Sequence, residues 1–149
     1  MKAGELMTAR PACCTPEDTI RGAAQLMREH DCGCIPVVKD KGSMRLVGVV
    51  TDRDIACRCT AEGKSPETPV KEAMTRDPKC CASDDDVETV EKIMAAEQVR
   101  RVPVVDEKGC CVGMIAQADL ALNARAASDS EVGKVVERIS EPAHASGSA

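Results

Sequence analysis

The sequence contains no phenylalanine, tyrosine or tryptophan among its 149 residues. Aromatic rings are the side chains on which proteins commonly stack a base or a sugar, and they normally supply much of the core volume. Their absence excludes recognition of a ligand by stacking on an aromatic side chain. The core must instead be built from Val, Ile, Leu, Met and Ala, with cysteine as a further small apolar residue.

Long apolar runs and an excess of positive charge are also missing. No stretch reaches the roughly 18 to 20 apolar residues that span a bilayer, and residues 1–5 lack the apolar core of a signal peptide. We therefore expect a cytoplasmic protein without membrane association. The balance of 20 basic and 25 acidic residues gives a net charge of −5, which argues against broad, sequence-independent nucleic-acid binding. Local basic clusters can still bind a small anion.

Recognisable catalytic motifs are absent too. The two histidines are His30 and His144. No nucleophile elbow, phosphate-cradling glycine loop or pair of catalytic carboxylates accompanies them. We expect a protein that is not an enzyme.

What the sequence does contain is an internal repeat, in which the pattern from Met7 to Asp54 returns from Met74 to Asp119. The aligned pairs are Met7/Met74, Thr8/Thr75, Pro11/Pro78, Cys13/Cys80, Cys14/Cys81, Asp18/Asp85, Met27/Met94, Pro36/Pro103, Val37/Val104, Val38/Val105, Gly42/Gly109, Gly48/Gly113 and Asp54/Asp119. The second copy is two residues shorter between Gly109 and Gly113 than the first copy is between Gly42 and Gly48, where a turn tolerates the deletion. The repeat therefore predicts two copies of one folded unit.

Each copy predicts the order helix, strand, strand, helix. Residues typical of helix starts, at 15–18 and 83–86, precede apolar residues at helical spacing. These apolar residues are Ile20, Ala23, Ala24 and Met27 in the first copy and Val87, Val90, Ile93 and Met94 in the second. Strands are predicted at 35–38, 46–50, 102–105 and 111–115, and the proline in the first strand of each copy indicates an edge strand or the start of a strand. The final helices begin near Thr51 and Gln117.

The predicted fold class is α/β, with two pseudo-twofold-related repeats packed sheet to sheet, because such a repeat cannot cover its own apolar surface. The predicted boundaries are 1–61 for the first repeat, 62–72 for a linker, 73–127 for the second repeat, 128–141 for a C-terminal helix and 142–149 for a disordered tail. Apolar residues at helical spacing in the C-terminal helix predict that it packs on the body of the protein or on a second subunit.

Several of these segments resemble the tandem cystathionine β-synthase (CBS) domain pair, or Bateman module. The resemblance covers roughly residues 5–122 and depends on Met-Thr at each repeat start, the Ile/Val-Pro-Val-Val strand and residues 48–55, Gly-Val-Val-Thr-Asp-Arg-Asp-Ile. Residues 27–31 and 98–104 are most similar to small stand-alone bacterial members of the family. The resemblance implies a regulatory, signal-transducing homodimer that acts on an effector protein. It also implies an adenosine-containing ligand, such as AMP, ADP, ATP, NAD or S-adenosylmethionine, in a cleft between the repeats, with no cofactor required.

The resemblance also implies ligand-binding residues at the start of the final helix of each repeat. Thr51 can donate its hydroxyl to ribose or phosphate, and Asp54 can accept both ribose hydroxyls. In the second repeat Asp119 matches, but Ala116 replaces the threonine, so the two sites are expected to be unequal. Helix capping is the alternative role for both first-repeat residues. Arg53 is a further ligand candidate, with a solvated surface charge as its alternative.

Basic residues distinguish the second repeat at the place where related modules often bind the phosphate. Arg100 and Arg101 lie just ahead of its strand proline, whereas Gly33 and Cys34 occupy those positions in the first repeat. We expect the better site to combine the threonine and aspartate of the first repeat with one of these arginines. A solvated surface position is the alternative for both arginines.

The ten cysteines provide a second functional hypothesis, a metal-binding or redox-sensing protein on the same scaffold. Cys32 and Cys34 beside His30 are the candidate metal ligands. No Cys-x-x-Cys occurs, however, and adjacent cysteines on a strand point to opposite faces, which disfavours a tetrahedral site. Reduced thiols that fill the core are the main expectation, and no metal is predicted.

Overall fold

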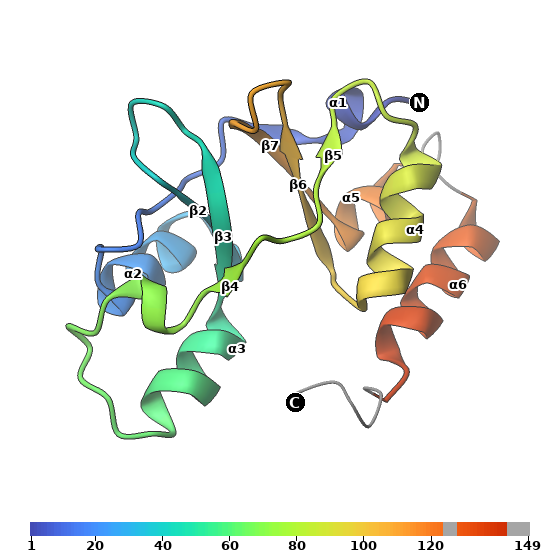
Figure 1. Ribbon diagram of the computed structural model, residues 1–149. Helices are drawn as coiled ribbons and strands as arrows, with labels where there is room; N and C mark the ends of the chain where they lie inside the picture. Colours follow the sequence, from blue (N-terminus) through green and yellow to red (C-terminus); the bar gives the residue numbers. More distant parts are fainter. Residues whose placement is uncertain (124–127, 143–149) are drawn as a thin grey trace. The chain divides into compact units, whose positions relative to one another are not determined.

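The computed structural model describes residues 1–123 and 128–142, and the chain in it forms two units. Unit 1 comprises Met1–Ala9, Lys79–Val104 and the chain from Gly113 onward, and unit 2 comprises Arg10–Pro78 and Val105–Val112. Each unit has a β-sheet with helices beside it (Figure 1). The predicted α/β fold class is therefore confirmed. The predicted end of the second repeat and almost all of the predicted tail lie outside the described residues.

Unit 2 is built on a three-stranded sheet in the order β2-β3-β4. The strands are β2 (Cys34–Val38), β3 (Leu46–Thr51) and β4 (Thr75–Arg76), and they pair antiparallel. Its helical segments are α2 (Ile20–Glu29), α3 (Asp52–Ile55), the π-helical turn η1 (Ala56–Thr60) and the 3-10 turn η2 (Val70–Glu72). The strand β2 lies at one end of this order, which is where its Pro36 predicts it to be.

Unit 1 contains most of a four-stranded sheet in the order β1-β7-β6-β5, of which the strand-end residues Val105, Cys111 and Val112 are assigned to unit 2. The strands are β1 (Thr8–Ala9), β5 (Cys81–Ala82), β6 (Arg101–Val105) and β7 (Cys111–Ala116), and the helices are α1 (Ala3–Leu6), α4 (Val87–Glu97), α5 (Gln117–Leu122) and α6 (Asp129–Ser140). The strand β6 lies between β7 and β5, and Pro103 is its third residue, so neither of the placements predicted for this proline, an edge strand or a strand start, is found. Because β5 has only two residues, it requires few hydrogen bonds from its neighbour, and a residue without an N–H group is tolerated there.

The start of α2 lies slightly later than the sequence pattern predicts. Thr19 is the N-cap, and its Oγ1 accepts a hydrogen bond from the N–H of Gly22 at 3.0 Å. In the turn before it, the carboxylate of Asp18 accepts from the N–H of Thr15 at 2.8 Å. Ala24, predicted to lie on the buried face of this helix, is exposed. Its i, i+1 position beside Ala23 turns it by about 100° away from the buried residues.

The core of unit 2 shows how a domain without aromatic residues is packed. Its members are Cys14, Ile20, Ala23, Met27, Ile35, Val37, Val50, Cys59, Val70, Ala73 and Met74. Two thiols and two thioethers thus lie among aliphatic side chains, where their polarisable sulfur atoms fill irregular space. The expectation that cysteine fills the core is confirmed for Cys14 and Cys59, which are 1% and 0% exposed.

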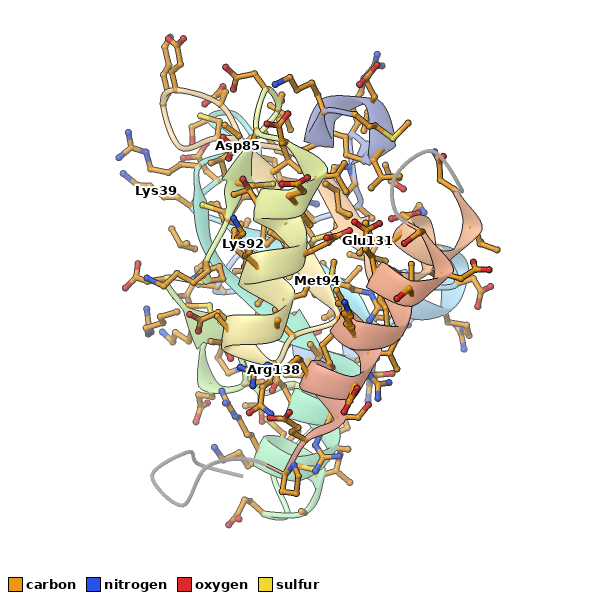
Figure 2. All side chains as sticks on the ribbon, turned by 90° about the vertical axis from the view of Figure 1, so that its right-hand side faces the viewer. Lys39, Asp85, Lys92, Met94, Glu131 and Arg138 are labelled. Carbon is orange, nitrogen blue, oxygen red and sulfur yellow. The ribbon has the colours of Figure 1, made fainter. Side chains whose placement is uncertain are left out.

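The C-terminal helix α6 packs on α4 and α5 of its own unit, as Figure 2 shows for α4. Val135 is the buried residue of this helix. Gln98 stabilises its end, because its side-chain amide donates to the carbonyls of Arg138 at 3.3 Å and Glu141 at 2.9 Å. Of the two packing partners that the sequence left open, the helix therefore contacts the body of the protein. None of the helices in the described ranges is long and apolar enough to cross a bilayer.

The opening strand of each repeat completes the sheet of the other repeat. The strand β1 pairs with β7, where Ala9 lies opposite Gly113, and β4 pairs with β3, where Arg76 lies opposite Gly48. Both glycines permit a close approach. A Cβ at Gly48 would lie 2.7 Å from the carbonyl oxygen of Thr75, and a Cβ at Gly113 would overlap Sδ of Met7. These two glycines therefore hold equivalent strand contacts in the two units.

We predict that Gly48→Ala destabilises the protein by roughly 1–3 kcal/mol, because the new methyl group overlaps a backbone oxygen that cannot move without β4. Gly133→Ala is the matched control. Gly133 lies in α6, and no atom comes within 4 Å of the position that a Cβ would take there, so alanine should stabilise the helix by up to about 1 kcal/mol. Urea unfolding of both variants measures the difference, and equal stabilities would contradict the close approach.

Candidate functional site

Thr51 and Asp54 lie where β3 runs directly into α3. The Thr51 Oγ1 accepts a hydrogen bond from the Asp54 N–H at 3.0 Å, and the Asp54 Oδ2 accepts one from the Thr51 N–H at 2.9 Å. This reciprocal arrangement is a capping box, which satisfies two backbone donors at the helix start and fixes both side chains. The structural alternative for these residues, helix capping, is thus present in the molecule.

The capping box leaves hydrogen-bonding capacity on both side chains. The Thr51 hydroxyl uses a lone pair in the box and keeps its proton for donation. The Asp54 Oδ1 accepts no hydrogen bond within the described residues and faces the Nε of Arg58 at 3.8 Å. The Asp54 side chain is 17% exposed, so solvent or a ligand can reach it. Capping and ligand binding are therefore compatible at this junction.

Arg58 is a residue of this site that the sequence reasoning missed. It lies in the π-helical turn η1 and pairs with Asp54. Its Nη1 also donates to two carbonyl oxygens, that of Ala73 at 3.1 Å and that of Met74 at 3.2 Å. The spacing of four residues from the aspartate was the available signal, since side chains at that spacing meet on a helix.

The equivalent junction of the second repeat keeps only half of the capping box. The Asp119 Oδ2 accepts from the N–H of Ala116 at 2.7 Å. Alanine has no hydroxyl, so the reciprocal bond to the aspartate N–H is absent. The junctions differ chemically, because only the first repeat offers a threonine hydroxyl beside its aspartate.

Beside each junction, two residues that contact each other differ between the repeats. Gly33 and Asp52 in the first repeat correspond to Arg100 and Gln117 in the second. In the first repeat the Asp52 N–H donates to the Gly33 carbonyl at 3.0 Å, and a Cβ on this glycine would lie 3.0 Å from the Asp52 Oδ2. In the second repeat the Gln117 N–H donates to the Arg100 carbonyl at 2.8 Å. The backbone contact is the same in both repeats. The side chains around it are acidic in one and basic in the other.

The arginine candidates lie in different parts of the structure. Arg53 is exposed, and its N–H donates to the Asp52 Oδ1 at 2.8 Å. Arg100 is exposed and Arg101 is half-buried, and both belong to unit 1, whereas the Thr51–Asp54 junction belongs to unit 2. A site that combines these arginines with that junction stays a prediction.

The candidate metal ligands do not form a cluster. His30 is exposed, Cys32 is half-buried and Cys34 is buried. Within the described ranges, no three or more His, Cys, Asp or Glu side chains are grouped so that they could hold a metal ion. These residues therefore do not fit a metal centre.

Burial keeps several thiols protonated. It raises the pKa of the Cys14 thiol to about 12, with the nearby Asp18 carboxylate adding to the effect, and raises the pKa of Cys81 to about 11. The pKa of Cys13 is also raised by burial. Since the thiolate is both the nucleophile and the metal ligand, these cysteines are poor candidates for either role at neutral pH.

We predict that iodoacetamide labels the folded protein at Cys57, which is exposed, and leaves Cys14 and Cys81 unmodified until the chain unfolds. The thiolate population of Cys14 is lower by roughly a thousandfold than that of an ordinary cysteine, and its sulfur is inaccessible. Peptide mapping by mass spectrometry, with and without denaturant, shows which cysteines are labelled in the folded and in the unfolded chain. Equal labelling of Cys14 and Cys57 in the folded protein would show that this thiol is not in the core.

Comparisons with known proteins agree with the presence of two repeats of one folded unit. The family model for the CBS domain matches residues 3–58 and again residues 70–124. The CBS domain-containing protein YhcV of Bacillus subtilis is 41% identical over 119 residues, which are 80% of this chain and 82% of YhcV. Hypoxic response protein 1 of Mycobacterium tuberculosis is 37% identical over 120 residues, which are 80% of this chain and 82% of that protein.

Solved structures with the same fold include three that hold ligands. Hypoxic response protein I with two coordinated zinc ions has a TM-score of 0.75 and 35% identity, covering 83% of this chain and 98% of that chain. CBSX2 in complex with AMP has a TM-score of 0.73 and 26% identity, with 83% and 96% covered. The CBS domain pair of MJ0100 with 5′-methylthioadenosine and S-adenosyl-L-methionine has a TM-score of 0.71 and 26% identity, with 82% and 94% covered.

Proposed function

Because the chain belongs to the CBS domain family and carries two copies of the domain, we propose that it is a regulatory module that senses an adenosine-containing nucleotide of the AMP, ADP, ATP or NAD class. It catalyses no reaction itself and requires no cofactor. The observation that carries the proposal is the ligand chemistry of its structural relatives, since CBSX2 holds AMP and the MJ0100 pair holds two adenosine derivatives.

The junction of β3 and α3 supports the proposal by its free hydrogen-bonding groups. A ribose presents two neighbouring hydroxyls that need acceptors, and the Asp54 Oδ1 is such an acceptor. The Thr51 hydroxyl can donate its remaining proton. Because the capping box holds both side chains in place before any ligand arrives, little side-chain freedom is lost on binding.

Charged side chains complete the proposed set of ligand-binding residues. Arg53, Arg100 and Arg101 are the candidates for the phosphate, since a guanidinium donates in a planar fork that matches phosphate oxygens. Asp119 is the candidate ribose acceptor of the second, weaker site. With no aromatic residue in the chain, the base must be held by backbone groups and by aliphatic and polar side chains.

Regulation requires that the nucleotide binds two arrangements of the protein with different affinities. We propose that the output passes through a homodimer or a separate effector protein. Thermal unfolding as a function of nucleotide concentration can detect such binding, because a ligand selective for the native state raises Tm.

We predict that calorimetry with AMP, ADP, ATP and NAD finds micromolar to millimolar binding of at least one nucleotide, and that Asp54→Ala weakens it by tenfold or more, about 1.4 kcal/mol. Asp18→Ala is the matched control. The Asp18 carboxylate also accepts a backbone N–H, that of Thr15 at 2.8 Å, so both variants lose a comparable bond. Asp18→Ala should keep full affinity. Equal nucleotide binding by wild type and Asp54→Ala would refute the assignment.

Zinc binding is the second candidate function, because the crystal structure of hypoxic response protein I holds two coordinated zinc ions. In this chain the described residues do not gather into a zinc site, and burial raises the pKa of several thiols. We therefore assign no metal to these residues and derive no step that needs one. Cysteine serves mainly as a core residue in this proposal.

We predict that protein purified under reducing conditions carries substoichiometric zinc and that EDTA leaves its Tm unchanged, because bound structural zinc contributes directly to folding free energy and its removal would lower Tm. Hypoxic response protein 1, treated in the same way, is the positive control for the metal analysis. Stoichiometric zinc with a Tm that falls on chelation would establish the metal function instead.

A further inference from the structure

One guanidinium group in unit 2 contacts both the proposed ribose acceptor and a distant part of the chain. The Nε of Arg58 lies 3.8 Å from the Asp54 Oδ1, and its Nη1 donates to the carbonyls of Ala73 and Met74. Asp54 lies in α3, whereas Ala73 and Met74 lie between η2 and β4. Arg58 thus links the start of α3 to the segment that enters β4.

The carbonyls that Arg58 binds belong to well-packed residues. Ala73 is 0% exposed and Met74 is 5% exposed, and the N–H groups of both donate to the carbonyl of Val70 at 2.9 Å. An arginine that donates two hydrogen bonds from one nitrogen to consecutive carbonyls restrains the backbone there, and charge makes such bonds stronger than neutral ones. Breaking this link should therefore loosen the segment.

The segment matters because of its place in the chain. It directly follows the linker of residues 62–72 and leads through β4 to Pro78, the last residue of unit 2 before the chain passes into unit 1 at Lys79. A change at Asp54 that strengthens or weakens its ion pair with Arg58 therefore alters the restraint on the backbone of residues 73 and 74, a few residues before the chain leaves unit 2.

The two repeats differ at this position, as they do at the capping threonine. Where the first repeat has Arg58, four residues after its aspartate, the second repeat has Asn123, four residues after Asp119. Asparagine carries no charge and has a shorter side chain, so it cannot provide the same link. A charged link of this kind is consequently a feature of the first-repeat junction.

Building on the proposed function, we infer that Arg58 is a positioning residue that couples nucleotide binding at Asp54 to the segment of residues 73–76. A ribose bound to Asp54 excludes water from the Asp54–Arg58 pair. Lower local polarity strengthens the attraction of opposite charges, so the guanidinium is held more firmly against the two carbonyls. By linkage, the segment then stabilises the nucleotide by the same factor that the nucleotide stabilises the segment.

Hydrogen–deuterium exchange of residues 70–78, measured with and without saturating AMP, tests this coupling. In the wild type, AMP should slow exchange in this segment by about fivefold or more. In Arg58→Gln the slowing should disappear, and the affinity for AMP should fall by the same factor. Arg58→Lys keeps the charge and should restore part of both effects, which a purely structural role would not require.

Arg21→Gln is the control, because Arg21 also forms an ion pair in unit 2, but with Glu67 at 2.9 Å rather than with Asp54. It should behave as the wild type does. If Arg58→Gln binds AMP with unchanged affinity and AMP still slows exchange, the coupling is wrong and Arg58 only stabilises the fold.

A second comparison, in nucleotide-free protein, separates this inference from the proposed function. Asp54→Asn keeps an oxygen that can accept the Thr51 N–H but removes the charge that faces Arg58, so exchange at 73–76 should accelerate about twofold to fivefold. Asp85→Asn should leave it unchanged, because the Asp85 carboxylate accepts the N–H of Ala82 at 2.8 Å within unit 1. Equal exchange in the two variants would overturn the link even if nucleotides bind. Failure of every nucleotide to bind the wild type would instead refute the proposed function.

Discussion

The close approach of two backbones at Gly48 is the contact on which the first-repeat junction depends. Because this residue lacks a Cβ, the opening strand of the second repeat can lie against β3, where a Cβ would be 2.7 Å from the Thr75 oxygen. That pairing fixes β4, and β4 fixes the carbonyls of Ala73 and Met74 that Arg58 binds. The same strand, β3, ends at Thr51. It therefore positions both the threonine of the proposed site and, through β4, the carbonyls that Arg58 binds.

The lack of aromatic residues shapes both the stability and the chemistry of the protein. Cores made of β-branched side chains, methionine and cysteine pack without rings, and the buried thiols in them are held in the protonated form. A ligand must then be recognised by hydrogen bonds and charge rather than by stacking. This requirement gives weight to the threonine, the aspartate and the arginines at the strand-to-helix junctions.

Local sequence signals predicted local structure well. The internal repeat, the strands that contain Pro36 and Pro103, and the helices after Thr51 and Ala116 follow from spacing and residue type. The Gly-Val-Val-Thr-Asp-Arg-Asp motif placed a threonine and an aspartate at one junction, and the structure brings them together there. The family assignment follows from the same residues.

Contacts between distant segments could not be predicted in the same way. The hydrogen bonds of Arg58 depend on where the chain returns after 15 residues, and no local pattern specifies that. The interior position of Pro103 likewise depends on neighbours in the folded state.

A crystal structure of the protein grown with AMP tests the central claim most directly. We expect ribose hydroxyls within about 2.6–3.2 Å of the Asp54 Oδ1, with the capping box between Asp54 and Thr51 intact and Arg58 still bound to the carbonyls of residues 73 and 74. AMP bound elsewhere, with no atom in hydrogen-bond contact with Asp54 or Thr51, would contradict the claim.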